Sequence, residues 1–240
     1  MAHADAVRHH RSSRRLAGLV LFSLLALILR PQNATSQDLS RQQLIPILGL
    51  TQGADTEPIG AVAYLVISFG ERKDRDGLAV HFRSTPGRFS PRAQTAVEQG
   101  IRRAARVIGV STDSWTVELS VPHPGLTVYG ESLSAMVGLT VIAMSRGEFI
   151  APDHVITGSV TPDGHIGMVG GVHLKIAAAG GAHMRRILIP EEQDVSDRDW
   201  ESPFLVQVSP VGSVSQAYSA LLETDTRPNP ALETLAQLKP

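Results

Sequence analysis

The chain has 240 residues, of which 42% are hydrophobic, and this length is sufficient for one domain with a sizeable core. Its formal net charge of -1 provides no electrostatic attraction for nucleic acid, so we expect no nucleic-acid partner. Cysteine is absent, which excludes disulfides, a thiolate metal site and a cysteine nucleophile.

The first 36 residues have the pattern of an export signal. A start rich in arginine and histidine precedes an uncharged run over residues 16–29, and a polar segment follows it. Ala34 and Ser36 fit the small-residue positions before a cut at Gln37. We therefore expect residues 1–36 to be a signal peptide or an uncleaved membrane anchor through residues 16–29, and the protein to be exported to the periplasm or the extracellular space. Arg14 and Arg15 fit a partial twin-arginine signal or an ordinary basic region equally well.

The next segments predict the first strands and helix of the domain. Residues 37–58 are polar apart from Leu44–Leu50, a run that contains proline and glycine, and predict an arm or an edge strand. Residues Ala61–Phe69 are rich in β-formers and predict a central strand, with Leu78–Phe82 as its hairpin partner across a charged turn. Ser90 and Pro91 predict the start of a helix that Gly109 ends, and Trp115–Val121 alternates as another strand.

The second half of the chain contains two helices of chemical interest. The apolar period over Gly130–Arg146 predicts a helix with Ser132 in its first turn, where unpaired N–H groups can hold a developing negative charge. Gly130 allows the backbone to approach a ligand closely. A further helix follows Gly170 and Gly171, contains Lys175 among alanines and is closed by a second glycine pair.

The remaining elements complete the predicted fold. Residues His154–Ser159 and His165–Met168 predict a hairpin, two short strands follow at Arg186–Ile189 and Phe204–Val208, and Ser213–Leu222 predicts a last helix. This order indicates a mixed α/β (α+β) domain over residues 59–222, followed by a flexible tail over residues 223–240.

Ser132 and Lys175 together suggest a nucleophile and its general base. A lysine among small apolar neighbours is desolvated, and this lowers its pKa enough for it to accept a proton. Each residue also has a simpler interpretation, because a serine at a helix start is usually an N-cap and a helix lysine usually reaches solvent. A Ser-His-Asp triad is a weaker alternative, since the sequence GESLS lacks the second glycine of a nucleophile elbow. No histidine pair has metal-ligand spacing with an acid, so we expect no metal and no cofactor.

The stretch from Gly130 to Pro190 resembles the proteolytic domain of Lon-type proteases. That family has glycine, one residue and the catalytic serine before a helix, which correspond here to Gly130, Glu131 and Ser132. It then has a threonine-glycine strand, a glycine pair and the catalytic lysine in an alanine-rich helix. Thr157 with Gly158, Gly170 with Gly171, and Lys175 occupy those positions, and the interval from Ser132 to Lys175 fits better than one from Ser134.

The resemblance implies a fold, a reaction and supporting residues. The fold is the mixed sheet with packed helices of the ribosomal protein S5 domain 2-like type, and the activity is that of a serine endopeptidase with a Ser132–Lys175 dyad. Thr157 would orient the lysine, while Gly130 and Glu131 flank the nucleophile without a catalytic role for the carboxylate. Family members also form rings, so a homo-oligomer is expected.

The sequence departs from the family in ways that bear on function. Glu131 replaces a common proline, Ser159 stands where a glutamate often follows the threonine-glycine pair, and no GxxxxGK[ST] phosphate loop occurs. We therefore expect an exported, stand-alone and ATP-independent peptidase that acts on flexible or unfolded polypeptide segments. The alternative is a non-catalytic binding or scaffold protein that keeps the Lon-like fold.

Overall fold

The structure is a computed structural model that describes residues 41–192 and 206–223. The expected signal segment, the acidic loop over residues 193–205 and the tail from residue 224 lie outside the described residues. Within the described ranges, no helix is both long and apolar enough to span a bilayer.

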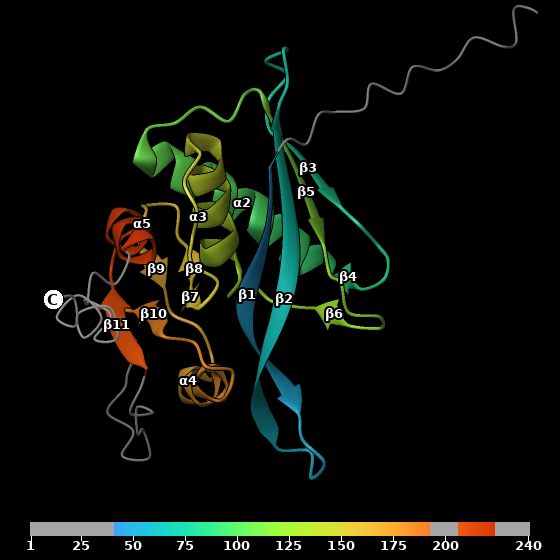
Figure 1. The fold of residues 1–240 in the computed structure, drawn as a ribbon, viewed down its shortest axis with the longest axis vertical. Helices are drawn as coiled ribbons and strands as arrows, with labels where there is room; N and C mark the ends of the chain where they lie inside the picture. The colour runs from blue at the N-terminus through green and yellow to red at the C-terminus, as the bar shows by residue number, and fades with distance from the viewer. Residues whose placement is uncertain (1–40, 193–205, 224–240) are drawn as a thin grey trace, which may run out of the picture. The chain divides into compact units, whose positions relative to one another are not determined.

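The main sheet has the strand order β1-β2-β5-β3 (Figure 1). Strand β1 (Arg41–Gln52) pairs antiparallel along its whole length with β2 (Pro58–Glu71), and β2 also pairs antiparallel with β5 (Trp115–Ser120). The predicted central strand thus lies within β2, and the segment predicted as an arm or edge strand is the edge strand β1. Ile45 and Ile47 of β1 are buried, so this strand contributes to the core.

The predicted hairpin between Ala61–Phe69 and Leu78–Phe82 is wrong. Strand β3 (Ala79–Phe82) pairs parallel with β5, and β5 separates it from β2. The charged segment after β2 is bound to the turn before β5, since the N–H groups of Arg72 and Gly77 donate to the carbonyls of Ser114 and Asp113. The segment between β2 and β3 therefore passes the start of β5, and β3 pairs with the edge of β5 that faces away from β2.

Helices α2 (Pro91–Ile108) and α3 (Ser134–Arg146) pack together in the larger hydrophobic core. The predicted start of α2 is confirmed, because the Ser90 hydroxyl accepts a hydrogen bond from the Ala93 N–H. Gly109, in the left-handed conformation, ends the helix. Gly100 and Gly138 lie where α2 and α3 meet, and a Cβ at Gly100 would approach the Ser134 carbonyl oxygen to 2.7 Å. The two helices therefore pack with their backbones nearly in contact.

A second, parallel sheet has the order β11-β10-β7, formed by β7 (His154–Ile156), β10 (Arg186–Pro190) and β11 (Gln207–Val211). The predicted last helix is α5 (Val214–Leu222), and Ser213 is its N-cap. The hairpin predicted for His154–Ser159 with His165–Met168 is correct only in its second part. Strand β8 (Ser159–Val160) pairs with β9 (Ile166–Gly167), whereas β7 pairs with β10 because the chain leaves the β7 ladder at Thr157 and Gly158.

Helix α4 (Val172–Gly181) packs against β2, β1 and β10 over a smaller apolar core, and the short parallel strands β4 (Arg88–Phe89) and β6 (Thr127–Val128) lie on the other side of β1 and β2 (Figure 1). The glycine pair predicted to close α4 forms its last turn instead, and Ala182 is the C-cap. The predicted mixed α/β architecture is confirmed.

Candidate active site

Ser132 lies in a turn before α3, not in the first turn of the helix as predicted. The first helical residue is Ser134, and Leu133 occupies the N-cap position without a side-chain capping hydrogen bond. Gly130 has φ of 81°, a backbone conformation that favours glycine, and the Ser134 N–H donates to the Glu131 carbonyl. These two features close a tight turn that presents Ser132. The hydroxyl is therefore not used for helix capping, which removes the simpler interpretation of this serine.

The turn that holds Ser132 is fixed by Gly158. The Gly158 N–H donates to the Ser132 carbonyl at 3.0 Å, and the Gly158 carbonyl accepts from the Ala135 N–H at 3.3 Å. One glycine backbone thus binds the chain on both sides of the serine. Gly158 lies between β7 and β8, so these two backbone hydrogen bonds give the serine turn a defined position relative to both strands.

Lys175 is the fourth residue of α4, and only 3% of its surface is exposed. Its Nζ donates a hydrogen bond to Thr157 Oγ1 at 3.1 Å, and Thr157 itself is fully buried. Desolvation by burial lowers the pKa of Lys175 to about 8. The simpler interpretation of a solvent-reaching lysine is therefore wrong, because the amine is held inside the protein.

Thr157 and Gly158 connect the two halves of the site. The Thr157 side chain holds the Lys175 amine, and the next residue holds the serine turn through its backbone. Thr157 is itself anchored, since its N–H donates to the Leu188 carbonyl of β10. Two adjacent residues therefore fix the positions of both groups predicted to form the dyad.

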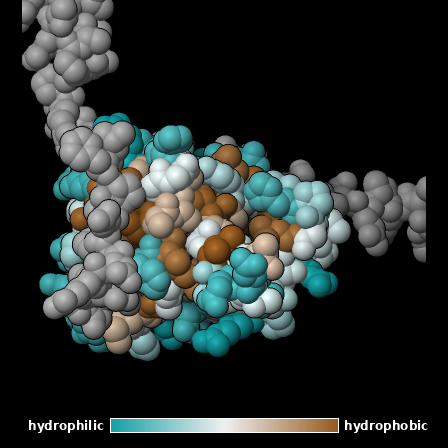
Figure 2. All heavy atoms as spheres, turned by 90° about the horizontal axis from the view of Figure 1, so that it is seen from below, coloured by the Kyte–Doolittle hydropathy of each residue, from teal (hydrophilic) through white to brown (hydrophobic). Residues whose placement is uncertain are grey.

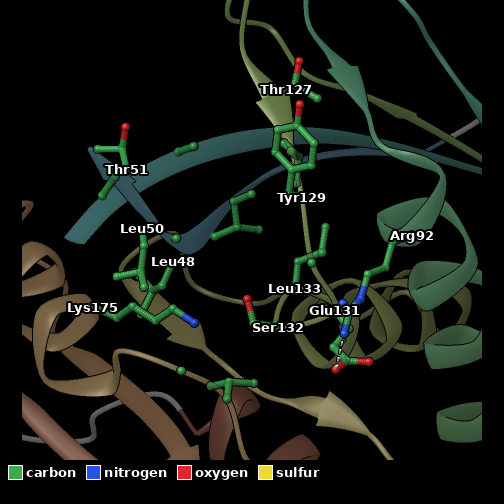
Figure 3. Close-up of a pocket in the computed structure, with 18 of the residues that line it drawn as sticks. Leu48, Leu50, Thr51, Arg92, Thr127, Tyr129, Glu131, Ser132, Leu133 and Lys175 are labelled. Atoms are coloured by element: carbon green, nitrogen blue, oxygen red, sulfur yellow. Dashed lines mark hydrogen bonds and ion pairs between the residues drawn. The ribbon is translucent and has the colours of Figure 1, made fainter. Parts of the chain in front are cut away.

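Ser132 and Lys175 line one cleft with a volume of about 910 Å³. Figure 3 shows the Lys175 amine extending toward the Ser132 hydroxyl from the α4 side. No direct hydrogen bond joins the two side chains in the described part of the chain, and catalytic hydrogen bonds often tighten only when a substrate binds. The cleft walls are the β1 residues 47–52 on one side and residues 126–133 on the other.

The other end of the cleft is polar. Arg92 of α2 and Glu131 lie on the side of Ser132 away from Lys175 and form an ion pair at 3.3 Å (Figure 3). Both side chains are largely exposed, so the pair contributes little to stability. The ion pair does place two charged side chains beside Ser132, at the end of the cleft away from Lys175.

Apolar side chains form much of the cleft lining. On the face seen from below in Figure 2, hydrophobic residues gather in a central patch between hydrophilic ones. Leu50, Tyr129 and Met168 line the cleft and are 45%, 71% and 59% exposed. Exposed apolar groups of this size around a cleft are typical of a binding surface for an apolar or extended ligand.

The histidines do not support a triad. None of the residues that line the cleft is a histidine, and no three histidine or acidic side chains within the described ranges gather as a metal site. His154 is buried but its Nδ1 contacts the Leu221 carbonyl, while His165 is paired with Asp163 on the surface. The arrangement therefore favours lysine as the base.

Sequence reasoning missed one wall of the cleft. The β1 residues 47–52, Arg92 and Met168 were not predicted as site residues, yet all line the cleft. The apolar run Leu44–Leu50 is the one sequence signal for the β1 wall. An edge strand that is half exposed does not need so many consecutive apolar residues. For Arg92 the sequence holds no signal, since an exposed arginine at a helix start is ordinary.

The fold and the cleft define a mixed α/β domain in which a serine and a buried lysine line one cleft. A family model described as the Lon protease (S16) C-terminal proteolytic domain matches residues 92–216, just over half of the chain. The chain therefore belongs to the Lon proteolytic-domain family, a family of serine peptidases.

Relatives in two domains of life agree with this assignment. The chain is 26% identical over 127 residues to the Lon protease of Mycolicibacterium smegmatis, covering 51% of this chain and 16% of that protein. It is 28% identical over 114 residues to the archaeal Lon protease of Archaeoglobus fulgidus, covering 47% and 18%. The similar figures for the archaeal Lon protease of Methanocaldococcus jannaschii are 29% over 98 residues, 41% and 15%. The matched region is thus less than a fifth of the length of these relatives.

Proposed function

We propose that this chain is a serine endopeptidase in which Ser132 is the nucleophile and Lys175 its general base. The observation that carries the proposal is the buried Lys175 amine, held by Thr157 and directed into the cleft that Ser132 lines. A pKa of about 8 leaves an appreciable neutral fraction near physiological pH, which an ordinary lysine lacks.

The reaction proceeds through an acyl-enzyme. The neutral Lys175 amine takes the proton of the Ser132 hydroxyl as Oγ bonds to the substrate carbonyl carbon, whose oxygen becomes negative. Protonated Lys175 then gives its proton to the leaving amine as the C–N bond breaks. A water molecule, deprotonated by the lysine, attacks the ester and releases the carboxylic acid, with the proton returned to Ser132.

Backbone donors near Ser132 supply the oxyanion site. The N–H groups of Ser134 and Ala135 are used within the fold, by the Glu131 and Gly158 carbonyls. Across the described residues, no hydrogen bond from the N–H of Ser132 or Leu133 is present, so these two donors are available beside the nucleophile. Fixed donors of this kind stabilise a developing oxyanion strongly because they need no reorganisation.

The substrate is a flexible or unfolded polypeptide segment that binds extended along β1. Six consecutive residues of this edge strand line the cleft, and its outer edge has no strand partner in the described sheet. An extended peptide can use such an edge for main-chain hydrogen bonds. The catalytic groups are all in this domain, so we propose that cleavage needs no ATP. Export and a ring-shaped homo-oligomer stay predictions from the sequence.

Cleavage of an unstructured protein such as casein, followed by mass spectrometry of the products, tests the function. Ser132→Ala and Lys175→Ala should each abolish cleavage, whereas Ser134→Ala and Lys73→Ala, as matched controls, should retain it. Activity that survives both dyad substitutions would remove the mechanism. Absence of cleavage in every variant and in the wild type would favour a binding or scaffold protein.

A further inference from the structure

Gly60 of β2 lies directly against the backbone of α4. A Cβ at this position would lie 1.9 Å from the Leu174 carbonyl oxygen and 2.5 Å from its carbonyl carbon. It would also approach Ala178 Cβ to 3.0 Å. The first two contacts are with helix backbone, which no side-chain rotation can relieve. Only glycine allows α4 to lie this close to β2.

The residue in contact with Gly60 immediately precedes the proposed base. Leu174 and Lys175 are consecutive in α4, so any displacement of the Leu174 carbonyl moves the start of the Lys175 side chain as well. We propose that Gly60 is a positioning residue for the peptidase reaction: its missing side chain sets how closely α4 packs on β2, and thereby places the Lys175 amine beside Thr157. The inference rests on the proposed function of Lys175.

The surroundings of Lys175 explain why its position matters. Thr157 Oγ1 is its hydrogen-bond partner, and the charged side chains that line the same cleft, Arg92 and Glu131, pair with each other. Burial alone lowers its pKa. A shift of α4 away from β2 would lengthen the bond to Thr157 and admit water, and the desolvation that favours the neutral amine would then be reduced.

Gly181, in the helix that Gly60 contacts, is a matched control. It is the last residue of α4, it is exposed, and a Cβ there would have nothing within 4 Å. Neither Gly60 nor Gly181 has a positive φ, so alanine suits the backbone at both. Gly60→Ala and Gly181→Ala therefore make the same chemical change, with and without a clash against α4.

The test is an NMR titration of lysine side chains. The sequence has lysine only at positions 73, 175 and 239, so labelling with ¹³C at Cε gives few signals, which lysine-to-arginine variants assign. We expect the Lys175 midpoint near pH 8 in the wild type and in Gly181→Ala. In Gly60→Ala it should lie at least about one pH unit higher, nearer the ordinary lysine value. Peptide cleavage at pH 7.5 should fall at least about tenfold in Gly60→Ala and recover partly at higher pH.

An unchanged Lys175 midpoint in folded Gly60→Ala would overturn the inference. If Gly60→Ala does not fold, the Lys175 midpoint is measured in Ala178→Leu, which adds bulk to the same contact from the α4 side. Ala177→Leu, at an exposed position of α4, is the control for this variant. A midpoint of Ala178→Leu equal to that of Ala177→Leu would then overturn it. The titration needs no substrate, so it stays informative even if Ser132→Ala retains cleavage and the proposed function fails.

Discussion

Lys175 has an ionisable amine at a buried position, where an apolar side chain is usual. Burial favours the neutral form and lowers its pKa to about 8. Because only the neutral amine can accept the Ser132 proton, kcat/KM should fall about tenfold for each pH unit below 8 and level off above it. A rate profile with a stable peptide between pH 6 and 10 measures this. A profile that still rises steeply at pH 9 to 10 would contradict a buried lysine as the base.

Thr157 fixes the orientation of that amine. Thr157→Val keeps the shape of this fully buried side chain but removes the oxygen that accepts from Lys175 Nζ. We expect kcat to fall by about tenfold or more, while KM changes little, because Thr157 is fully buried and does not line the cleft. Steady-state kinetics measure both parameters. An equal loss from Thr140→Val, another fully buried threonine that does not line the cleft, would indicate a general packing defect instead.

Individual residues of the site were predictable to different degrees. Ser132, Lys175 and Thr157 were predicted as site residues because their spacing and glycine neighbours match a known pattern. The sequence did not reveal that Ser132 precedes α3, because helical periodicity continues into the tight turn that Gly130 starts. Gly60 was not predictable, since nothing in the sequence shows which backbone it will face after folding.

At the scale of elements, the crossing of α2 and α3 depends on glycine. A Cβ at Gly100 would meet the Ser134 carbonyl oxygen at 2.7 Å, and one at Gly138 would meet the Gly100 oxygen at 2.9 Å. Gly100→Ala should therefore destabilise the domain by about 1–3 kcal/mol, although alanine is the better helix former. Denaturant unfolding measures this, with Gly181→Ala as the control that should cost nothing. Equal stability of the two variants would show that α2 and α3 separate without cost.

The elements themselves were largely predictable, and their partners were not. A β-forming run and an alternating run predicted β2 and β5, and a capping signal predicted the start of α2. The pairing of β3 with β5 follows from hydrogen bonds between two loops, and the separation of β7 from β8 follows from contacts with the serine turn. Both depend on residues distant in sequence, which local patterns do not record.

For the molecule as a whole, the buried base lowers stability near neutral pH. Below pH 8 the folded and unfolded chains both carry the Lys175 charge, and the folded chain bears its desolvation. Between pH 8 and 10.5 the unfolded chain binds a proton at Lys175 that the folded chain does not, so the contribution of Lys175 to the stability of the wild type rises with pH. Lys175→Met should thus be more stable than the wild type by about 2 kcal/mol at pH 7, and less so toward pH 10.5.

Thermal or denaturant unfolding of both proteins across this pH range tests the difference. Comparing the two proteins cancels other groups, including Tyr218, whose pKa is raised to about 12 by burial and by Glu148. A stability difference that does not change with pH would mean that Lys175 titrates alike in the folded and unfolded chains.

The cleft has two walls that come from separate parts of the chain. Ser132, Thr157 and Lys175 lie within one contiguous stretch, whereas the facing wall is residues 47–52, more than seventy residues earlier. The residues proposed for the reaction and the residues proposed to contact a substrate are therefore encoded by different segments of the gene. Mutation can change the β1 wall, and with it the proposed selectivity for peptides, without altering the segment that contains Ser132, Thr157 and Lys175.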